Sequence, residues 1–159
     1  MSREFSFGRL LGSLFFCWAA GLASFLFAIP SLDSWYARLT KPGFAPPAGL
    51  FLPLWLFLYT LMGVGLYLLW SEDTKRVEVK KTVLLYVMQL LLSVLWSSSF
   101  FGLRALWLAA LVCLCQFVVL LQTILRLQKL LSLAAYLMMP QLLWTGYCLI
   151  FTWSTTIIN

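Results

Sequence analysis

The chain has 159 residues, of which 63% are hydrophobic and only 10% are charged, with a net charge of +6. This composition is far from that of soluble globular proteins and predicts a protein that resides in lipid. Because one crossing of a bilayer needs ~20 mostly apolar residues, about five crossings use the whole length and leave no room for a separate soluble domain. The positive charge does not indicate nucleic-acid binding, since the basic residues are spread over short loops.

Five apolar runs, separated by short polar connections, are predicted as transmembrane helices. They cover about residues 10–29, 50–70, 83–101, 105–125 and 130–157. Their hydrophobicity is continuous and does not alternate, which excludes a β-barrel, and backbone at membrane depth must be hydrogen-bonded within a helix. We therefore predict one domain over residues 1–159, an all-α integral membrane bundle of five helices.

The first span is too long for a signal peptide and lacks a clear cleavage site, so we expect it to remain in the mature protein. Pro30 is predicted to end its helix. Residues 31–49, which connect it to the second span, are rich in proline and glycine. This connection is too long for a simple hairpin and is predicted to be a structured loop.

The later connections are shorter. The charged run 71–76 precedes the third span, and residues 102–104 make so tight a connection that the third and fourth spans must be antiparallel neighbours. The fifth span exceeds the bilayer thickness, which predicts a tilted helix or one broken near Pro140. Ser93 and Ser97 permit close helix approach, either within one bundle or at a dimer seam on the third span.

The basic residues divide unequally between the two sides of the membrane. Those on the side of the N-terminus are Arg3, Arg9, Lys75, Arg76, Lys80, Lys81, Arg126 and Lys129, whereas the other side has only Arg38, Lys41 and Arg104. The positive-inside rule then predicts a cytoplasmic N-terminus if the membrane is a bacterial inner membrane, and a C-terminus on the opposite face. An organelle membrane is the alternative location.

The predicted spans contain no Asp, Glu, Lys, Arg or His, although such residues normally mark proton relays and ion paths. Ion-coupled transport is therefore not favoured, and no general acid, general base or metal site is predicted. Cysteine occurs only within the apolar runs, where it usually behaves as a small buried hydrophobe; these positions are Cys17, Cys113, Cys115 and Cys148.

Eight tryptophans are many for this length. Those near span ends suit an interfacial belt, whereas Trp55, Trp96 and Trp144 lie deep in their spans. Deep indoles offer π-faces to a flat apolar ligand, or else they pack in the helix core. Tyr59 shares a helix face with Trp55 at i, i+4, and Gln89 shares one with Trp96 at i, i+7.

The block from Trp35 to Pro47, Trp-Tyr-Ala-Arg-Leu-Thr-Lys-Pro-Gly-Phe-Ala-Pro-Pro, resembles the translocator protein family, also called tryptophan-rich sensory proteins or peripheral-type benzodiazepine receptors. The match continues in order over nearly the whole chain. It includes Pro53, Trp55, Leu58-Tyr59, Met62-Gly63, Tyr67 to Trp70, Gln89-Leu90, Trp96-Ser97, Phe100 to Gly102, Pro140 and Trp144.

The resemblance implies a five-helix bundle, often a homodimer, in which the first loop is a lid over the pocket. It implies binding of porphyrins such as protoporphyrin IX and haem, of sterols, and of synthetic benzodiazepine or isoquinoline ligands, with no required cofactor. Trp55 and Trp144 match the pocket tryptophans implicated in porphyrin degradation. Tyr59, Gln89 and Trp96 match other lining positions, and Cys148 takes a small-residue position there.

The chain also departs from the family pattern. Ser93 replaces an asparagine, Gln141 replaces the tyrosine that follows the proline of the fifth span, and Phe44 replaces the usual loop tryptophan. A basic residue needed for the sterol motif after the last aromatic residue, Trp153, is absent. These departures bear on ligand preference more than on the fold.

Taken together, the residues and the resemblance predict a receptor or transporter-like protein for tetrapyrroles. A macrocycle would stack on the three deep tryptophans, and Arg38 or Lys41 at the pocket mouth would meet its propionates. Two alternatives are a light-dependent porphyrin-degrading enzyme that uses Trp55 and Trp144, and a structural dimer.

Overall fold

The structure, a computed structural model, describes residues 6–72 and 76–159. Arg3 and Lys75, counted above among the basic residues, lie outside these ranges, as do residues 73–74 of the charged run. The elements are α1 (Phe7–Ser31), η1 (Leu32–Tyr36), η2 (Ala48–Leu50), α2 (Phe51–Trp70), α3 (Val77–Ser97), η3 (Ser98–Gly102), α4 (Leu106–Leu130) and α5 (Ser132–Ile158). Within these two ranges, five helical segments are long and apolar enough to cross a membrane, which confirms the predicted all-α fold.

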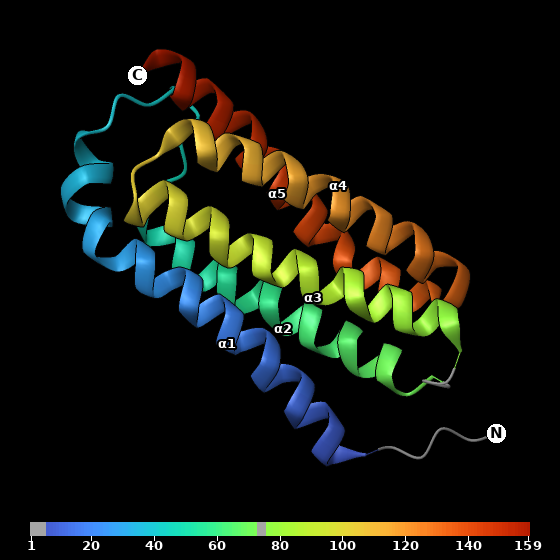
Figure 1. The fold of residues 1–159 in the computed structure, drawn as a ribbon. Coiled ribbons are helices and arrows are strands. Elements are labelled where there is room, and N and C mark those ends of the chain that lie inside the picture. The colour runs from blue at the N-terminus through green and yellow to red at the C-terminus, as the bar shows by residue number, and fades with distance from the viewer. Residues whose placement is uncertain (1–5, 73–75) are drawn as a thin grey trace.

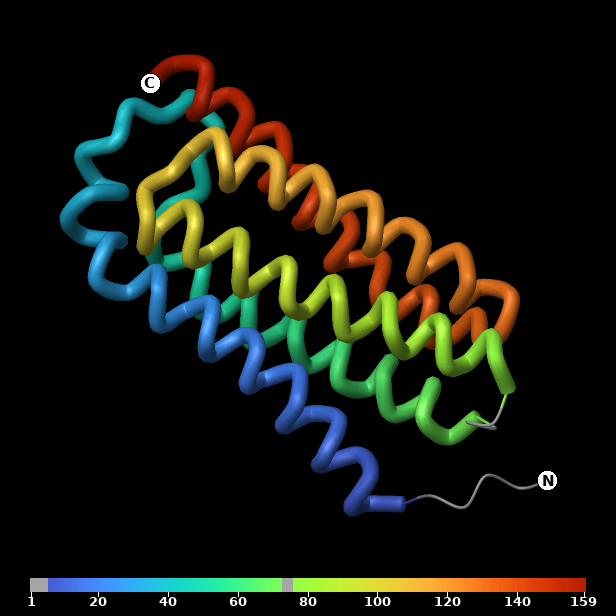
Figure 2. Tube along the Cα trace, viewed as in Figure 1, coloured from blue at the N-terminus to red at the C-terminus, as the bar shows by residue number. Residues whose placement is uncertain are grey.

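The five long helices lie alongside one another in a bundle (Figure 1), and their contacts make a closed ring. Helix α1 packs against α2 and α3, α2 packs against α5, and α4 packs against both α3 and α5. The order around the ring is therefore α1, α2, α5, α4, α3, which leaves the centre of the bundle surrounded on all sides. Helix α1 begins and α5 ends at opposite ends of the bundle, as Figure 2 shows along the chain trace.

Helix α1 buries small side chains and exposes large ones. Its buried residues recur every three or four positions and are Ser13, Cys17, Gly21, Ser24, Ala28 and Ser31. Large apolar residues such as Phe15 and Leu22 are exposed on the outer face. In lipid, exposure of large apolar side chains on the outer face has no free-energy cost. On the inner face, a stripe of small residues lets neighbouring backbones approach closely. The sequence pattern of α1 is therefore that of a membrane helix.

The prediction that Pro30 ends the first helix is wrong. Pro30 lies inside α1, which continues to Ser31 and then, as the π-helix η1, to Tyr36. The backbone N–H of Leu32 still donates to the carbonyls of Ala28 and Ile29. Proline lacks only its own N–H, so one helical hydrogen bond is lost while the N–H groups that follow it still reach carbonyls of the preceding turn.

Charged residues extend α3 beyond the predicted third span. The helix begins at Val77, ahead of the predicted residue 83, and most residues of this additional part are exposed. Arg126 near the end of α4 pairs with Glu78 at 2.8 Å, which links the start of α3 to the end of α4. At the other end of these helices, Arg104 adopts a positive φ of 55° in the short turn between them, which confirms that they are antiparallel neighbours.

The small residues of α3 pack within the bundle. Ser97 is fully buried and its hydroxyl donates to the backbone carbonyl of Ser24 in α1 at 2.6 Å. Ser93 is also buried. These two serines therefore do not form an open dimer seam. Helix α5, in turn, passes through Pro140 without a break.

Candidate ligand-binding cavity

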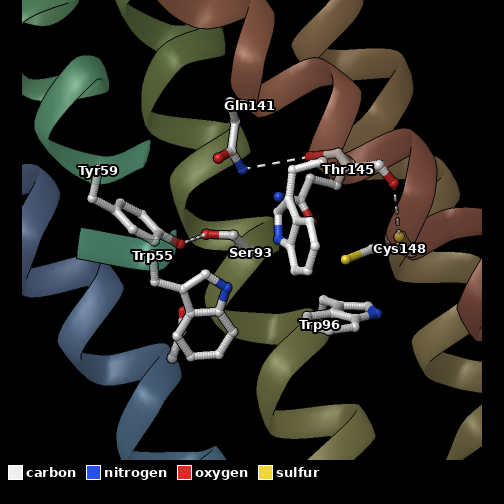
Figure 3. A pocket seen from close by; sticks show the side chains of 11 residues that line it. Trp55, Tyr59, Ser93, Trp96, Gln141, Thr145 and Cys148 are labelled. Atoms are coloured by element: carbon white, nitrogen blue, oxygen red, sulfur yellow. Dashed lines mark hydrogen bonds between the residues drawn. The ribbon is translucent and has the colours of Figure 1, made fainter. Parts of the chain in front are cut away.

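A buried cavity lies at the centre of the ring, and all five long helices contribute to it (Figure 3). Its lining residues are Ser24, Trp55, Tyr59, Ser93, Trp96, Cys113, Gln116, Gln141, Trp144, Thr145 and Cys148. The set combines three tryptophans with a group of uncharged polar side chains. Carboxylates, ammonium groups and guanidinium groups do not occur in this lining.

The indoles are held by neighbouring rings. Trp55 makes an edge contact with Phe51 at 5.6 Å between ring centroids. Trp96 stacks on Phe100 at 5.5 Å, with 19° between the ring planes. Trp144 stacks on Tyr147 at 5.2 Å. Such aromatic pairs add to the free energy of burial and fix ring orientation, so the indoles present defined surfaces to the cavity.

The polar side chains form short hydrogen-bonded chains. The hydroxyls of Tyr59 and Ser93 lie 2.7 Å apart, and Ser93 donates to the carbonyl of Leu90 at 2.9 Å, so Tyr59 is the donor of the pair. The Gln141 amide N–H donates to the Thr145 hydroxyl at 3.4 Å. The amide oxygen of Gln141 is buried without a hydrogen-bond partner. The cavity therefore has an aromatic part and an incompletely satisfied polar part.

Five of the predicted site residues meet in this cavity: Trp55, Tyr59, Trp96, Trp144 and Cys148. Gln89 does not. It lies on the same face of α3 as Ser93 and is fully buried, but one turn closer to the start of the helix, and it is not among the lining residues. Both polar atoms of its side-chain amide are buried without a partner.

Arg38 and Lys41 also lie outside the lining. The Lys41 ammonium donates to the backbone carbonyls of Tyr36 and, at 3.3 Å, of Leu39, and it lies 4.6 Å from the centroid of the Tyr36 ring. A cation at a helix C-terminus satisfies carbonyls that have no helical partner. Arg38 is exposed on the same segment. Lys41 is thus used to fix the chain, whereas Arg38 faces outward.

The first loop is fastened to the last helix. Tyr147 of α5 donates to the carbonyl of Phe44 at 2.5 Å, and Asn159 donates through its amide to the carbonyl of Thr40 at 2.8 Å. Since Tyr147 also stacks on Trp144, the loop is connected to a cavity residue through one intervening ring. This arrangement matches the expected structured loop.

Several lining residues were not predicted as site residues from the sequence. They are Ser24, Ser93, Cys113, Gln116, Gln141 and Thr145. The available signal was the presence of glutamine within apolar spans, because polar side chains at membrane depth face the bundle interior. Gln116 and Gln141 are both 4% exposed, in agreement with that rule.

The enclosed space itself is small, about 20 Å³, which is close to the volume that one water molecule requires. A larger groove of about 370 Å³ lies outside the ring between α1 and α2. Trp55 and Tyr59 line both spaces and separate them. The Tyr59 ring packs on Gly21, where an added Cβ would lie only 2.7 Å from a ring carbon.

Known proteins resemble the chain over most of its length. The profile of the TspO/MBR family matches residues 13–158. A tryptophan-rich protein TspO of Chlorobaculum tepidum is 36% identical over 134 residues, which are 82% of this chain and 83% of that protein. The translocator protein of Homo sapiens is 36% identical over 114 residues, 71% of this chain and 68% of that protein. A tryptophan-rich sensory protein of Cereibacter sphaeroides is 28% identical over 132 residues, 82% of this chain and 80% of that protein.

Proposed function

Because the chain belongs to the TspO/MBR family, we propose that this multi-pass membrane protein is a receptor or transporter-like protein that binds tetrapyrroles, such as protoporphyrin IX and haem, inside its helix bundle. The observation that carries the proposal is the convergence of Trp55, Trp96 and Trp144 on one buried cavity. These indoles come from three different helices, so local sequence alone does not explain their meeting.

The chemistry of the lining suits a flat, largely apolar ligand. Indole faces stack on extended π-systems, and the absence of charged groups in the lining favours a ligand whose buried part is uncharged. Burial and stacking of this kind supply an affinity in the micromolar range, about 8 kcal/mol. Sterols and synthetic benzodiazepine or isoquinoline compounds share the apolar character and are proposed as further ligands.

A macrocycle requires the cavity to open, because the enclosed space holds about one water molecule. The wall formed by Trp55 and Tyr59 is the element that has to move, since the groove beyond it is already about 370 Å³. That volume falls in the usual range for ligand pockets. Side-chain rotation at these two residues would join the two spaces without unfolding a helix.

The charged propionates of a porphyrin must lie in polar surroundings, outside the uncharged lining of the cavity. We place them at the end of the bundle under the first loop, where Trp144 and Tyr147 connect the cavity to Phe44. Arg38 is the exposed cation of this segment and is proposed as their partner, in a partly solvated and salt-sensitive contact. Lys41 would have to leave its carbonyl partners to contribute.

A second candidate function is light-dependent breakdown of the bound porphyrin. What favours it is that Trp55 and Trp144 both line the cavity, where their indoles would be redox-active groups beside the ligand. Transport or sensing and homodimer formation remain parts of the first proposal. Product formation under illumination separates an enzyme from a receptor.

The direct test is a titration of the purified protein with protoporphyrin IX, followed by quenching of tryptophan fluorescence. Saturable quenching with a dissociation constant in the micromolar range is expected. The control is an equal amount of protein-free detergent or lipid with free tryptophan. A linear, non-saturating response up to the solubility limit of the porphyrin would show that the cavity is not a tetrapyrrole site.

A further inference from the structure

Gln141 presents an unused hydrogen-bond acceptor to the cavity. The residue is 4% exposed, it lines the cavity from α5, and its side-chain oxygen is buried with no partner. The side-chain nitrogen is oriented by its bond to the Thr145 hydroxyl. In Figure 3 the amide projects from one end of the pocket, opposite the indoles of Trp55 and Trp96.

Several other polar groups of the lining have their hydrogens engaged elsewhere and do not satisfy this oxygen. The Tyr59 hydroxyl donates to Ser93, and Ser93 donates to the carbonyl of Leu90. The indole N–H of Trp96 donates to the Thr152 hydroxyl at 3.3 Å. The protein therefore offers a buried acceptor whose complementary donor has to come from whatever occupies the cavity.

An unpaired buried acceptor discriminates between ligands. A ligand that fills the cavity without a donor leaves the oxygen desolvated, whereas a ligand with an N–H or O–H at that position restores the lost hydrogen bond. Sites built around a buried polar group reject analogues that lack the matching group far better than apolar pockets reject a change in size. The position of Gln141 thus bears on selectivity and not only on packing.

We propose that Gln141 is a specificity-determining residue, whose amide oxygen accepts a hydrogen bond from an N–H or O–H donor on a flat aromatic ligand that contacts the cavity tryptophans. The proposal rests on the proposed function, because it assigns a ligand to the same cavity. It adds the chemical requirement that the ligand carry a donor at the end facing α5.

Carbazole and dibenzofuran test this requirement. They are flat and nearly identical in shape, and they differ in that carbazole has an N–H where dibenzofuran has an ether oxygen. Each compound is added to lipid nanodiscs that contain the protein, and its retention is measured beyond that of protein-free nanodiscs of the same lipid. We expect the protein to bind carbazole about tenfold more tightly than dibenzofuran.

Two variants test whether the preference for carbazole over dibenzofuran depends on Gln141. Gln141→Met keeps the length of the side chain and removes the amide, so the two compounds should bind within about twofold of each other. Gln89→Met is the matched control, because Gln89 is a fully buried glutamine that does not line the cavity. It should retain the tenfold preference. Since the preference of the wild-type protein is measured without any variant, the test survives a failure of Gln141→Met to fold.

The possible outcomes distinguish the role of Gln141 from the ligand-binding function on which it rests. Equal binding of both compounds by the wild type, or an unchanged preference in Gln141→Met, would overturn the role of Gln141 while leaving the cavity as a binding site. Retention of neither compound, together with no protoporphyrin quenching, would overturn the ligand-binding function itself, and the inference with it.

Discussion

Arg38 and Lys41 lie three residues apart in the sequence, yet the structure gives them different surroundings. The Lys41 ammonium is bound to the carbonyls at the end of the first helical segment, whereas the Arg38 side chain is exposed. A charge that caps backbone carbonyls stabilises the loop, and a free charge is available to an anionic ligand. Replacement of each residue should therefore weaken ligand binding for a different reason.

Arg38→Ala is expected to weaken protoporphyrin binding several-fold and to leave an uncharged isoquinoline ligand unaffected, because only the porphyrin loses a counter-charge. Lys41→Ala is expected to weaken both ligands to a similar degree by loosening the loop. The measurement is a pair of titrations for each variant at low and high salt. If Arg38→Ala weakened both ligands equally, the electrostatic role of Arg38 would be wrong.

Trp144 offers a second test on a single side chain. It lines the cavity, stacks on Tyr147 and contacts Phe51 at 6.2 Å between ring centroids. Trp144→Ala should lower the affinity for protoporphyrin and for an isoquinoline about tenfold or more, since both lose apolar contact area. Trp107→Ala is the control, because Trp107 is 62% exposed on the outer face of α4. Equal losses in the two variants would argue for a general effect on the fold.

The close approach of α1 and α2 depends on small residues at the contact. A Cβ added at Gly63 would lie 2.7 Å from a side-chain carbon of Leu14 and 2.9 Å from its Cα. The second of these atoms belongs to the backbone, which cannot rotate away, so the two helices would have to separate. The glycine is therefore required by packing between helices and not by backbone conformation.

Gly63→Ala is expected to destabilise the bundle by about 1–3 kcal/mol, the usual cost of overpacking. Thermal unfolding in detergent, followed by circular dichroism, measures the shift. Gly12→Ala, also in this helix pair, is the control, because nothing lies within 4 Å of a Cβ at that position. It should be neutral or slightly stabilising, since alanine is the better helix former. A stable Gly63→Ala protein would mean that α1 adjusts more easily than its contacts suggest.

For the whole molecule, the unequal distribution of basic residues predicts a cytoplasmic N-terminus in a bacterial inner membrane. The odd number of spans places the C-terminus on the other face, in accord with the opposite ends of the bundle in Figure 1. Reporter fusions at each terminus measure this directly. Both reporters on one side would contradict the five-span fold, whereas exchanged sides would contradict only the orientation.

Hydropathy was sufficient to predict the number and order of the spans, because a membrane requires long apolar helices whatever their packing. It could not predict helix ends such as Val77, since Glu78 and Lys80 continue the helix outside the hydrocarbon layer. Pro30 misled the prediction because proline often ends a helix but also occurs within one, at the loss of one backbone hydrogen bond, and hydropathy does not distinguish the two cases.

The site was only partly predictable for a similar reason. The deep tryptophans could be found from composition and resemblance, and burial of Gln89, Gln116 and Gln141 follows from their polarity, whereas Gln122 near the end of its span is exposed. Burial does not say which side of a helix meets a cavity or at what depth. Gln89 and Gln141 are both buried glutamines, yet only Gln141 lines the cavity, and that difference depends on the register of α3 and α5 in the assembled ring.

The cavity is separated from the groove on the outer face of the bundle by Trp55 and Tyr59. This position affects how the affinity of a ligand should be expressed. A ligand that passes between them comes from the bilayer, where most of a strongly partitioning compound is dissolved, so its occupancy is best expressed against its mole fraction there. Adding protein-free lipid at a fixed amount of ligand then dilutes the ligand and lowers occupancy. Two compounds should therefore be compared at equal mole fractions in the bilayer.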